Sequence, residues 1–215
     1  MKSKQLSIIL EIGVFLGGSA KVWLDSIPNV IVLALDPWSG GEWLGRFTRS
    51  LDQPEWVAEQ LEADEDAMYE TFLTNMWDYR DRIIPIRGMA PEALYDLHRF
   101  GAEPDLVYLD ADKSGRELEV CRQLFPQAVL TGDDWFMGSD RFWQPDKGYP
   151  IRKPVRDFCR RHNSRLMVDK ATWVITDESL PLSYVAATLP RYHFKSIRRR
   201  IRGAFRWCAR LDKAA

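Results

Sequence analysis

The sequence predicts an α/β fold: a doubly wound, mostly parallel sheet with helices on both faces and an antiparallel last strand. Short, almost continuously apolar segments alternate with segments of helical periodicity, a pattern typical of parallel strands buried on both faces. In residues 165–176 only three residues separate two apolar runs, which permits a hairpin and makes the final strand antiparallel. With 215 residues, the chain can form one domain with a full hydrophobic core.

Five apolar runs that end in glycine or an acidic residue are the predicted parallel strands. In chain order they cover residues 7–14, 30–36, 82–88, 105–110 and 128–133. Helical periodicity predicts helices over residues 19–27, 91–100, 114–125 and 155–164. Ser114 and Glu117 have the spacing of a capping box, which predicts where the third of these helices begins.

Residues 37–81, between the second and third strands, form a connection much longer than a usual crossover. We expect one helix there, over residues 57–79. The segment is rich in aromatic residues, namely Trp38, Trp43, Phe47, Trp56, Tyr69, Phe72, Trp77 and Tyr79. Two interpretations are open: an extra helix that packs its rings on the domain, or an inserted lid that forms a wall of a substrate pocket.

Composition indicates a soluble globular protein, with 46% hydrophobic and 28% charged residues. Cys121, Cys159 and Cys208 are odd in number and widely spaced, which favours thiols in a reducing compartment over a disulfide framework or a zinc site. Basic residues precede the first apolar run, as in a signal peptide, but Glu11 within the run favours a core strand. We therefore expect a cytoplasmic protein.

Residues 191–215 differ from the rest of the chain, with nine Lys or Arg against one Asp. Apolar residues recur there every three or four positions, which predicts a basic amphipathic helix outside the domain of residues 1–190. This helix either lies on an anionic membrane surface, at the inner face of a membrane, or docks on the acidic body or on a second subunit of a homo-oligomer. Docking is the preferred interpretation. Nothing in the body indicates a nucleic-acid-binding surface.

The stretch EIGVFLGGS, residues 11–19, places glycines between the first strand and the first helix. Glycine allows positive φ and close backbone approach, and a helix N-terminus offers free N–H groups. Ligands of open α/β sheets bind at this edge. The spacing of the glycines differs from a dinucleotide fingerprint, and Lys21 lies too far along the helix for a P-loop. The stretch alone leaves a dinucleotide, a phosphate and a sulfonium cofactor open as ligands.

Acidic residues end two further strands. Asp110 lies in LDADK, residues 109–113, and Asp133 and Asp134 lie in TGDDW, residues 131–135. We expect the three carboxylates to converge, because neighbouring parallel strands end at the same edge of the sheet. Their repulsion is relieved by a hard divalent cation such as Mg²⁺, which prefers oxygen ligands. The alternative is a turn and helix cap at residues 132–134, with Asp110 next to a cofactor only.

These three motifs, with Asp36 at the end of the second strand, resemble those of class I S-adenosylmethionine-dependent methyltransferases, and more narrowly of metal-dependent small-molecule O-methyltransferases. The resemblance spans residues 7–176 and implies the Rossmann-like class I methyltransferase fold. It implies a cofactor site at Glu11, Gly13, Gly17, Gly18, Ser19, Asp36, Met89, Ala90 and Asp110. It implies a magnesium site at Asp110, Asp133 and Asp134.

The resemblance also implies a reaction, the methylation of a hydroxyl group on a sugar, a polyketide or another secondary metabolite. Lys113 lies where related enzymes place a base, so Lys113 and Asp110 are the implied catalytic residues. A surface lysine that pairs with Asp112 is the alternative. The long connection and residues 135–149 would form the acceptor pocket. A second class of function stays open: a protein of the same fold that binds S-adenosylmethionine in a hydroxylase-associated or scaffolding role.

Overall fold

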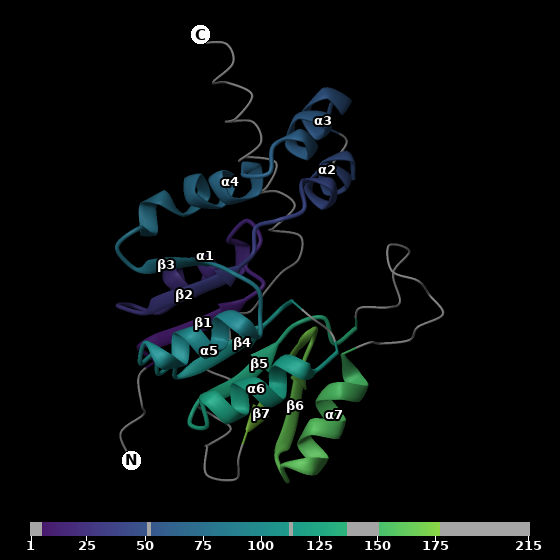
Figure 1. Cartoon of the computed structure of the whole chain (residues 1–215). Coiled ribbons are helices and arrows are strands. Elements are labelled where there is room, and N and C mark those ends of the chain that lie inside the picture. The colour runs from purple at the N-terminus through teal and green to yellow at the C-terminus, as the bar shows by residue number, and fades with distance from the viewer. Residues whose placement is uncertain (1–5, 51–52, 112–113, 137–150, 177–215) are drawn as a thin grey trace.

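The computed structural model describes residues 6–50, 53–111, 114–136 and 151–176. Within these ranges the chain forms a seven-stranded sheet in the order β3-β2-β1-β4-β5-β7-β6 (Figure 1). The strands are β1 (Ile8–Ile12), β2 (Ile31–Asp36), β3 (Ile83–Arg87), β4 (Leu106–Leu109), β5 (Val129–Gly132), β6 (Arg165–Asp169) and β7 (Thr172–Thr176). The first five pair in parallel, and β7 runs antiparallel to both β5 and β6. The predicted fold class is confirmed.

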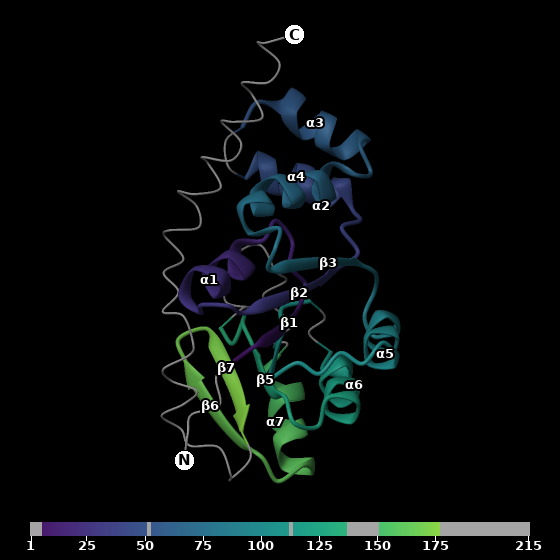
Figure 2. The same cartoon turned by 90° about the vertical axis from the view of Figure 1, so that its left-hand side faces the viewer.

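Helices cover both faces of this sheet (Figures 1 and 2). The helical elements of the described residues are α1 (Gly18–Ser26), α2 (Gly41–Arg49), α3 (Glu55–Ala63), α4 (Ala67–Met76), the 3₁₀ turn η1 (Trp77–Tyr79), α5 (Glu92–Arg99), α6 (Arg116–Leu124) and α7 (Arg152–Arg161). Of these, α2 and α3 pack on each other beyond α4 and do not cover the sheet. Trp23 of α1 and Phe72 of α4 are buried against strand residues on one face. Leu94, Leu118 and Phe158, from α5, α6 and α7, are buried on the other. Each face therefore has its own apolar core.

The connection between β2 and β3 holds three helices and a 3₁₀ turn, so the prediction of one helix over residues 57–79 is wrong. The helix is interrupted at residues 64–66, where the side chain of Asp64 accepts a hydrogen bond from the backbone N–H of Asp66. An aspartate that bonds its own backbone in this way competes with helical hydrogen bonds. Trp38 and Phe72 are fully buried, with ring centroids 4.5 Å apart, so the start of this segment and α4 pack into the domain.

Helix α6 begins two residues later than predicted. Gly115 is its N-cap in a left-handed conformation, and no side chain caps the helix. Ser114 precedes the N-cap, and its hydroxyl accepts a hydrogen bond from the N–H of Arg116. A Cβ on Gly115 would lie 2.5 Å from the Cβ of Pro154 in α7, so packing between two helices sets this start. The capping-box prediction is therefore wrong.

Two further predictions concern the cysteines and the chain's relation to membranes. Cys121 and Cys159 are buried thiols, as predicted from their spacing. In the described part of the chain, no helix combines the length and apolar character needed to cross a membrane. The basic helix predicted over residues 191–215 lies outside the described residues, as does Cys208.

The core beneath α7 gives a test of the fold. Phe158 is fully buried, whereas Phe100 at the end of α5 is 85% exposed. We expect Phe158→Ala to lower the free energy of unfolding by about 3–5 kcal/mol, through lost burial and the cavity left behind. Phe100→Ala is the matched control and should change it by less than about 0.5 kcal/mol. Urea unfolding followed by circular dichroism measures both, and equal losses would contradict the described core.

Candidate functional site

The candidate site begins where β1 and β4 end side by side. The N–H of Asp110 donates to the carbonyl of Ile12 at 2.8 Å. Gly13 follows with φ at +85°, and a Cβ there would lie 2.6 Å from the carbonyl oxygen of Asp110. The strand order reverses between β1 and β4, and open α/β sheets bind ligands at such a point. The turn of residues 13–17, which we call the glycine turn, therefore meets Asp110 at the expected edge of the sheet.

The glycine turn is held from two sides. The carboxylate of Asp36 accepts hydrogen bonds from the backbone N–H groups of Phe15, at 2.9 Å, and Trp38, at 2.7 Å. The indole N–H of Trp38 in turn donates to the carbonyl of Phe15 at 2.7 Å. From α4, the side-chain amide of Asn75 donates to the carbonyl of Leu16 at 3.1 Å. The turn is thus fixed by the end of β2 and by the long connection.

Gly17 lies beneath α4. Its φ is +85°, and a Cβ there would lie 2.5 Å from the sulfur of Met76. We expected this glycine to admit a ligand, but in the structure the neighbouring atoms belong to Met76 and Phe72. Asn75 and Met76 were not expected at the turn, since no local signal in the sequence links them to it. For Trp38 a signal was present, because a residue two positions after an aspartate often bonds its carboxylate.

Glu11 is a buried acid on β1. The hydroxyl of Ser19 donates to its Oε1, while its Oε2 is buried and has no hydrogen-bond partner among the described residues. Burial raises the pKa of Glu11 to about 8, against the opposing effect of the Ser19 hydrogen bond, and the charges of Asp110 and Asp36 raise it further. Three carboxyl groups from β1, β2 and the end of β4 therefore act on one another. A cationic ligand would stabilise the charged forms of these three carboxyl groups.

Asp133 and Asp134 follow β5, next to the end of β4 as predicted. A Cβ on Gly132 would lie 2.4 Å from the carbonyl oxygen of Leu109. The indole of Trp173 donates to the carbonyl of Asp133 at 2.9 Å, and Asp134 has a left-handed φ of 66°. Within the described residues, however, no three His, Cys, Asp or Glu side chains are grouped so that they could hold a metal ion. The structure brings the strand ends together without assembling the predicted ligand set.

The remaining predicted residues lie around the same edge. Gly18 begins α1 and is exposed. The N–H of Gly88 donates to the carbonyl of Asp36 at 3.1 Å, which places the chain after β3 beside β2. Beyond it, Met89 is exposed and Ala90 packs against the core of the second face. Lys113 lies outside the described residues, as do residues 137–149 of the predicted acceptor loop.

Comparisons with known proteins identify the fold. No family model and no curated protein matches the sequence. Among solved structures, a protein assigned provisionally as a caffeoyl-CoA O-methyltransferase from Staphylococcus aureus is 14% identical, with a TM-score of 0.55 over 80% of this chain and 76% of that one. The O-methyltransferase TomG from Streptomyces achromogenes, solved in complex with SAM, is 22% identical, with a TM-score of 0.50 over 80% and 74%. The chain therefore has the class I methyltransferase fold.

The buried carboxyl of Glu11 predicts a pH dependence of stability. Between the ordinary pKa of 4.5 and about 8, the folded protein keeps a proton that the unfolded chain has lost. The free energy of unfolding should therefore fall as pH rises through this window, by at most about 1.4 kcal/mol per pH unit. Glu11→Gln removes the titration, so its unfolding free energy should fall less steeply. Urea unfolding at several pH values tests this, and parallel curves for the two proteins would contradict it.

Proposed function

We propose that this protein transfers a methyl group from S-adenosylmethionine to a hydroxyl group of a small molecule. The observation that carries the proposal is the meeting of the glycine turn with Glu11, Asp36 and Asp110 at the point where the strand order reverses. The shared fold supports it, since TomG was solved with SAM and is described as acting in tomaymycin synthesis. A sugar, a polyketide or another secondary metabolite is the proposed acceptor.

The residues at the strand ends fit this cofactor in charge and in hydrogen-bonding capacity. Each oxygen of the Asp36 carboxylate already accepts one backbone N–H and keeps lone pairs for ribose hydroxyls. When a cationic ligand displaces the proton of Glu11, its orphaned Oε2 and the nearby Asp110 would stabilise the positive charge of the methionine part of the cofactor. Ser19 and the exposed Gly18, at the start of α1, extend the site, and the backbone of Met89 and Ala90 would face the adenine.

S-adenosylmethionine supplies an electrophilic methyl group on a sulfonium sulfur. The chain must therefore orient the acceptor hydroxyl and remove its proton. In our proposal the neutral amine of Lys113 takes this proton, while Asp110 orients the hydroxyl toward the methyl carbon. The oxygen–carbon bond forms as the sulfur–carbon bond breaks, which leaves S-adenosylhomocysteine. Positioning the two reactants side by side supplies much of the rate.

We further propose that Asp110, Asp133 and Asp134 hold a divalent ion, with Mg²⁺ as the first candidate. A bound ion of this kind lowers the pKa of a hydroxyl group. The support is chemical, since carboxylate oxygens are suitable ligands and the ends of β4 and β5 adjoin. Because the three side chains are not grouped as ligands in the structure, binding of the ion requires them to reorient.

The cofactor assignment predicts a loss of affinity in Asp36→Ala. We expect the affinity for S-adenosylmethionine to fall by about 1–3 kcal/mol, because hydrogen bonds to a charged acceptor are lost. Asp96→Ala, on the exposed surface of α5, is the matched control and should bind as the parent does. Isothermal titration calorimetry measures all three proteins. Unchanged affinity in Asp36→Ala would contradict the placement of the ribose.

The metal assignment predicts that chelation stops turnover. Removal of divalent ions with EDTA should abolish methyl transfer to a panel of hydroxylated acceptors, and Mg²⁺ or Mn²⁺ should restore it. Asp133→Ala should lose this rescue while it still binds S-adenosylmethionine, because the main proposed cofactor contacts lie at the ends of β1 and β2. Asp169→Ala, at the exposed end of β6, controls for the loss of a surface charge. Full activity in EDTA would exclude a required ion.

A further inference from the structure

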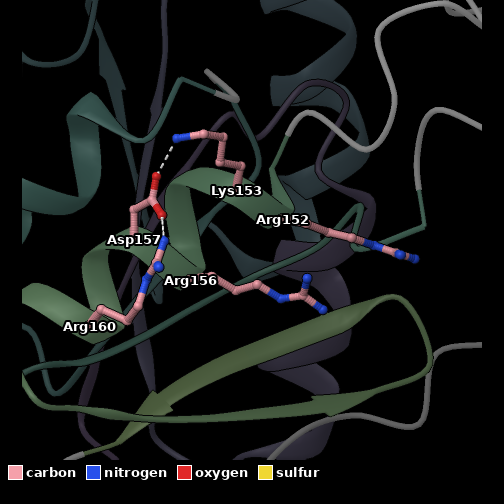
Figure 3. Close-up of a pocket in the computed structure, with 5 residues that line it drawn as sticks. All are labelled: Arg152, Lys153, Arg156, Asp157 and Arg160. Atoms are coloured by element: carbon pink, nitrogen blue, oxygen red, sulfur yellow. Dashed lines mark hydrogen bonds and ion pairs between the residues drawn. The ribbon is translucent and has the colours of Figure 1, made fainter.

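Helix α7 carries a strongly basic surface that has no role in the proposed reaction. Arg152, Lys153, Arg156, Asp157 and Arg160 line a hollow of about 380 Å³ (Figure 3). We call it the α7 hollow. Four cationic side chains and one carboxylate line it, so the lining has an excess of positive charge. Such a surface attracts anions, but a solvated basic helix would show the same excess. The arrangement of the individual side chains distinguishes an anion-binding surface from a solvated basic helix.

One side of the hollow is internally paired. The carboxylate of Asp157 accepts a hydrogen bond from Lys153 at 2.5 Å and another from Arg160 (Figure 3). These two hydrogen bonds lower the pKa of Asp157, so its charge persists at neutral pH. Lys153 and Arg160 are therefore partly neutralised, and Arg156 carries positive charge that Asp157 does not pair.

The other side of the hollow is ordered by stacking on a buried ring. The guanidinium carbons of Arg152 and Arg156 each lie 5.5 Å from the centroid of the Trp135 ring, and that of Arg152 lies 4.7 Å from the Phe136 ring. The Nε of Arg152 also donates to the carbonyl of Trp135 at 2.6 Å. Among the described residues, Arg156 forms no ion pair or hydrogen bond through its side chain. Stacking on Trp135 thus orients the guanidinium group of Arg156 without occupying its N–H donors.

The hollow lies next to the proposed site. Trp135, which orders both arginines, directly follows the acidic pair Asp133 and Asp134 at the end of β5. Helix α7 begins with Arg152 at this edge of the sheet, so its first turns are the ones closest to the strand ends. A small molecule with a hydroxyl group at the strand ends could therefore extend an anionic group to Arg152 and Arg156.

We propose that the α7 hollow binds a phosphate or pyrophosphate group of the methyl acceptor, with Arg156 as the principal contact. The inference rests on the proposed function and adds the chemical class of its substrate. A guanidinium group presents two parallel N–H donors that match the oxygens of a phosphate, and a pre-oriented side chain loses less entropy on binding. Arg152 and Arg156 position the acceptor and take no part in the transfer of the methyl group.

Titration of the whole chain with sodium pyrophosphate tests this proposal without turnover. Isothermal titration calorimetry should show binding that Arg156→Ala weakens by about tenfold, as expected for one charged hydrogen-bonded contact. Arg156→Lys keeps the charge but loses the paired donors, so its affinity should lie between the two. Arg99→Ala removes an exposed arginine from α5 and is the matched control, with affinity equal to that of the parent.

The outcomes separate this inference from the proposed function. Absent binding, or equal affinity in Arg156→Ala and Arg99→Ala, would overturn the phosphate subsite, even if S-adenosylmethionine binds normally. If the parent protein binds pyrophosphate but does not bind S-adenosylmethionine, the proposed methyl transfer is overturned and the α7 hollow remains an anion site. Binding of a single-stranded oligonucleotide or of phosphatidylserine vesicles that depends on Arg156, without binding of pyrophosphate, would overturn the small-molecule assignment.

Discussion

The candidate site depends on one backbone contact, that between Gly13 and the carbonyl of Asp110. Any Cβ at Gly13 would lie 2.6 Å from that oxygen, so β1 and β4 can end side by side only with glycine there. The contact lies where the strand order reverses. It brings Asp110 close enough to Glu11 for its charge to raise the pKa of that buried acid. The position of the glycine turn follows from the same contact.

Charge is distributed unevenly along this edge of the sheet. Carboxyl groups gather at the ends of β1, β2 and β4. Burial and the repulsion from Asp110 and Asp36 both make the charged form of Glu11 unfavourable there. Asp133 and Asp134 continue the acidic edge after β5, and the sign reverses at α7, which presents arginines ordered by Trp135. A cationic cofactor and an anionic acceptor would each meet complementary charge on its own side. This separation would orient two ligands of opposite sign without a barrier between their sites.

Much of the fold could be predicted because periodicity is local. The five parallel strands, the hairpin and four helices agree with their apolar patterns to within a few residues. The start of α6 and the role of Gly17 could not be predicted, since each depends on a distant side chain, Pro154 or Met76. In the site, the motif indicated Glu11 and Asp36. The hydrogen bonds from the side chains of Asn75 and Trp38 to the glycine turn could be seen only in the folded chain. The orientation of carboxylates at strand ends is likewise set by packing, which spacing does not encode.

The packing of Trp38 and Phe72 has a consequence for how this protein diversifies. Both side chains are fully buried in the cluster that also contains strand residues such as Ile9 and Val32, although they belong to the long connection. The start of the connection and α4 are therefore structural parts of the domain, whereas α2 and α3 pack mainly on each other. A lineage that altered the start of the connection or α4 to accept a new substrate would alter its own core at the same time. New specificity should then arise more readily from the surface of α7, where substitutions leave the core intact.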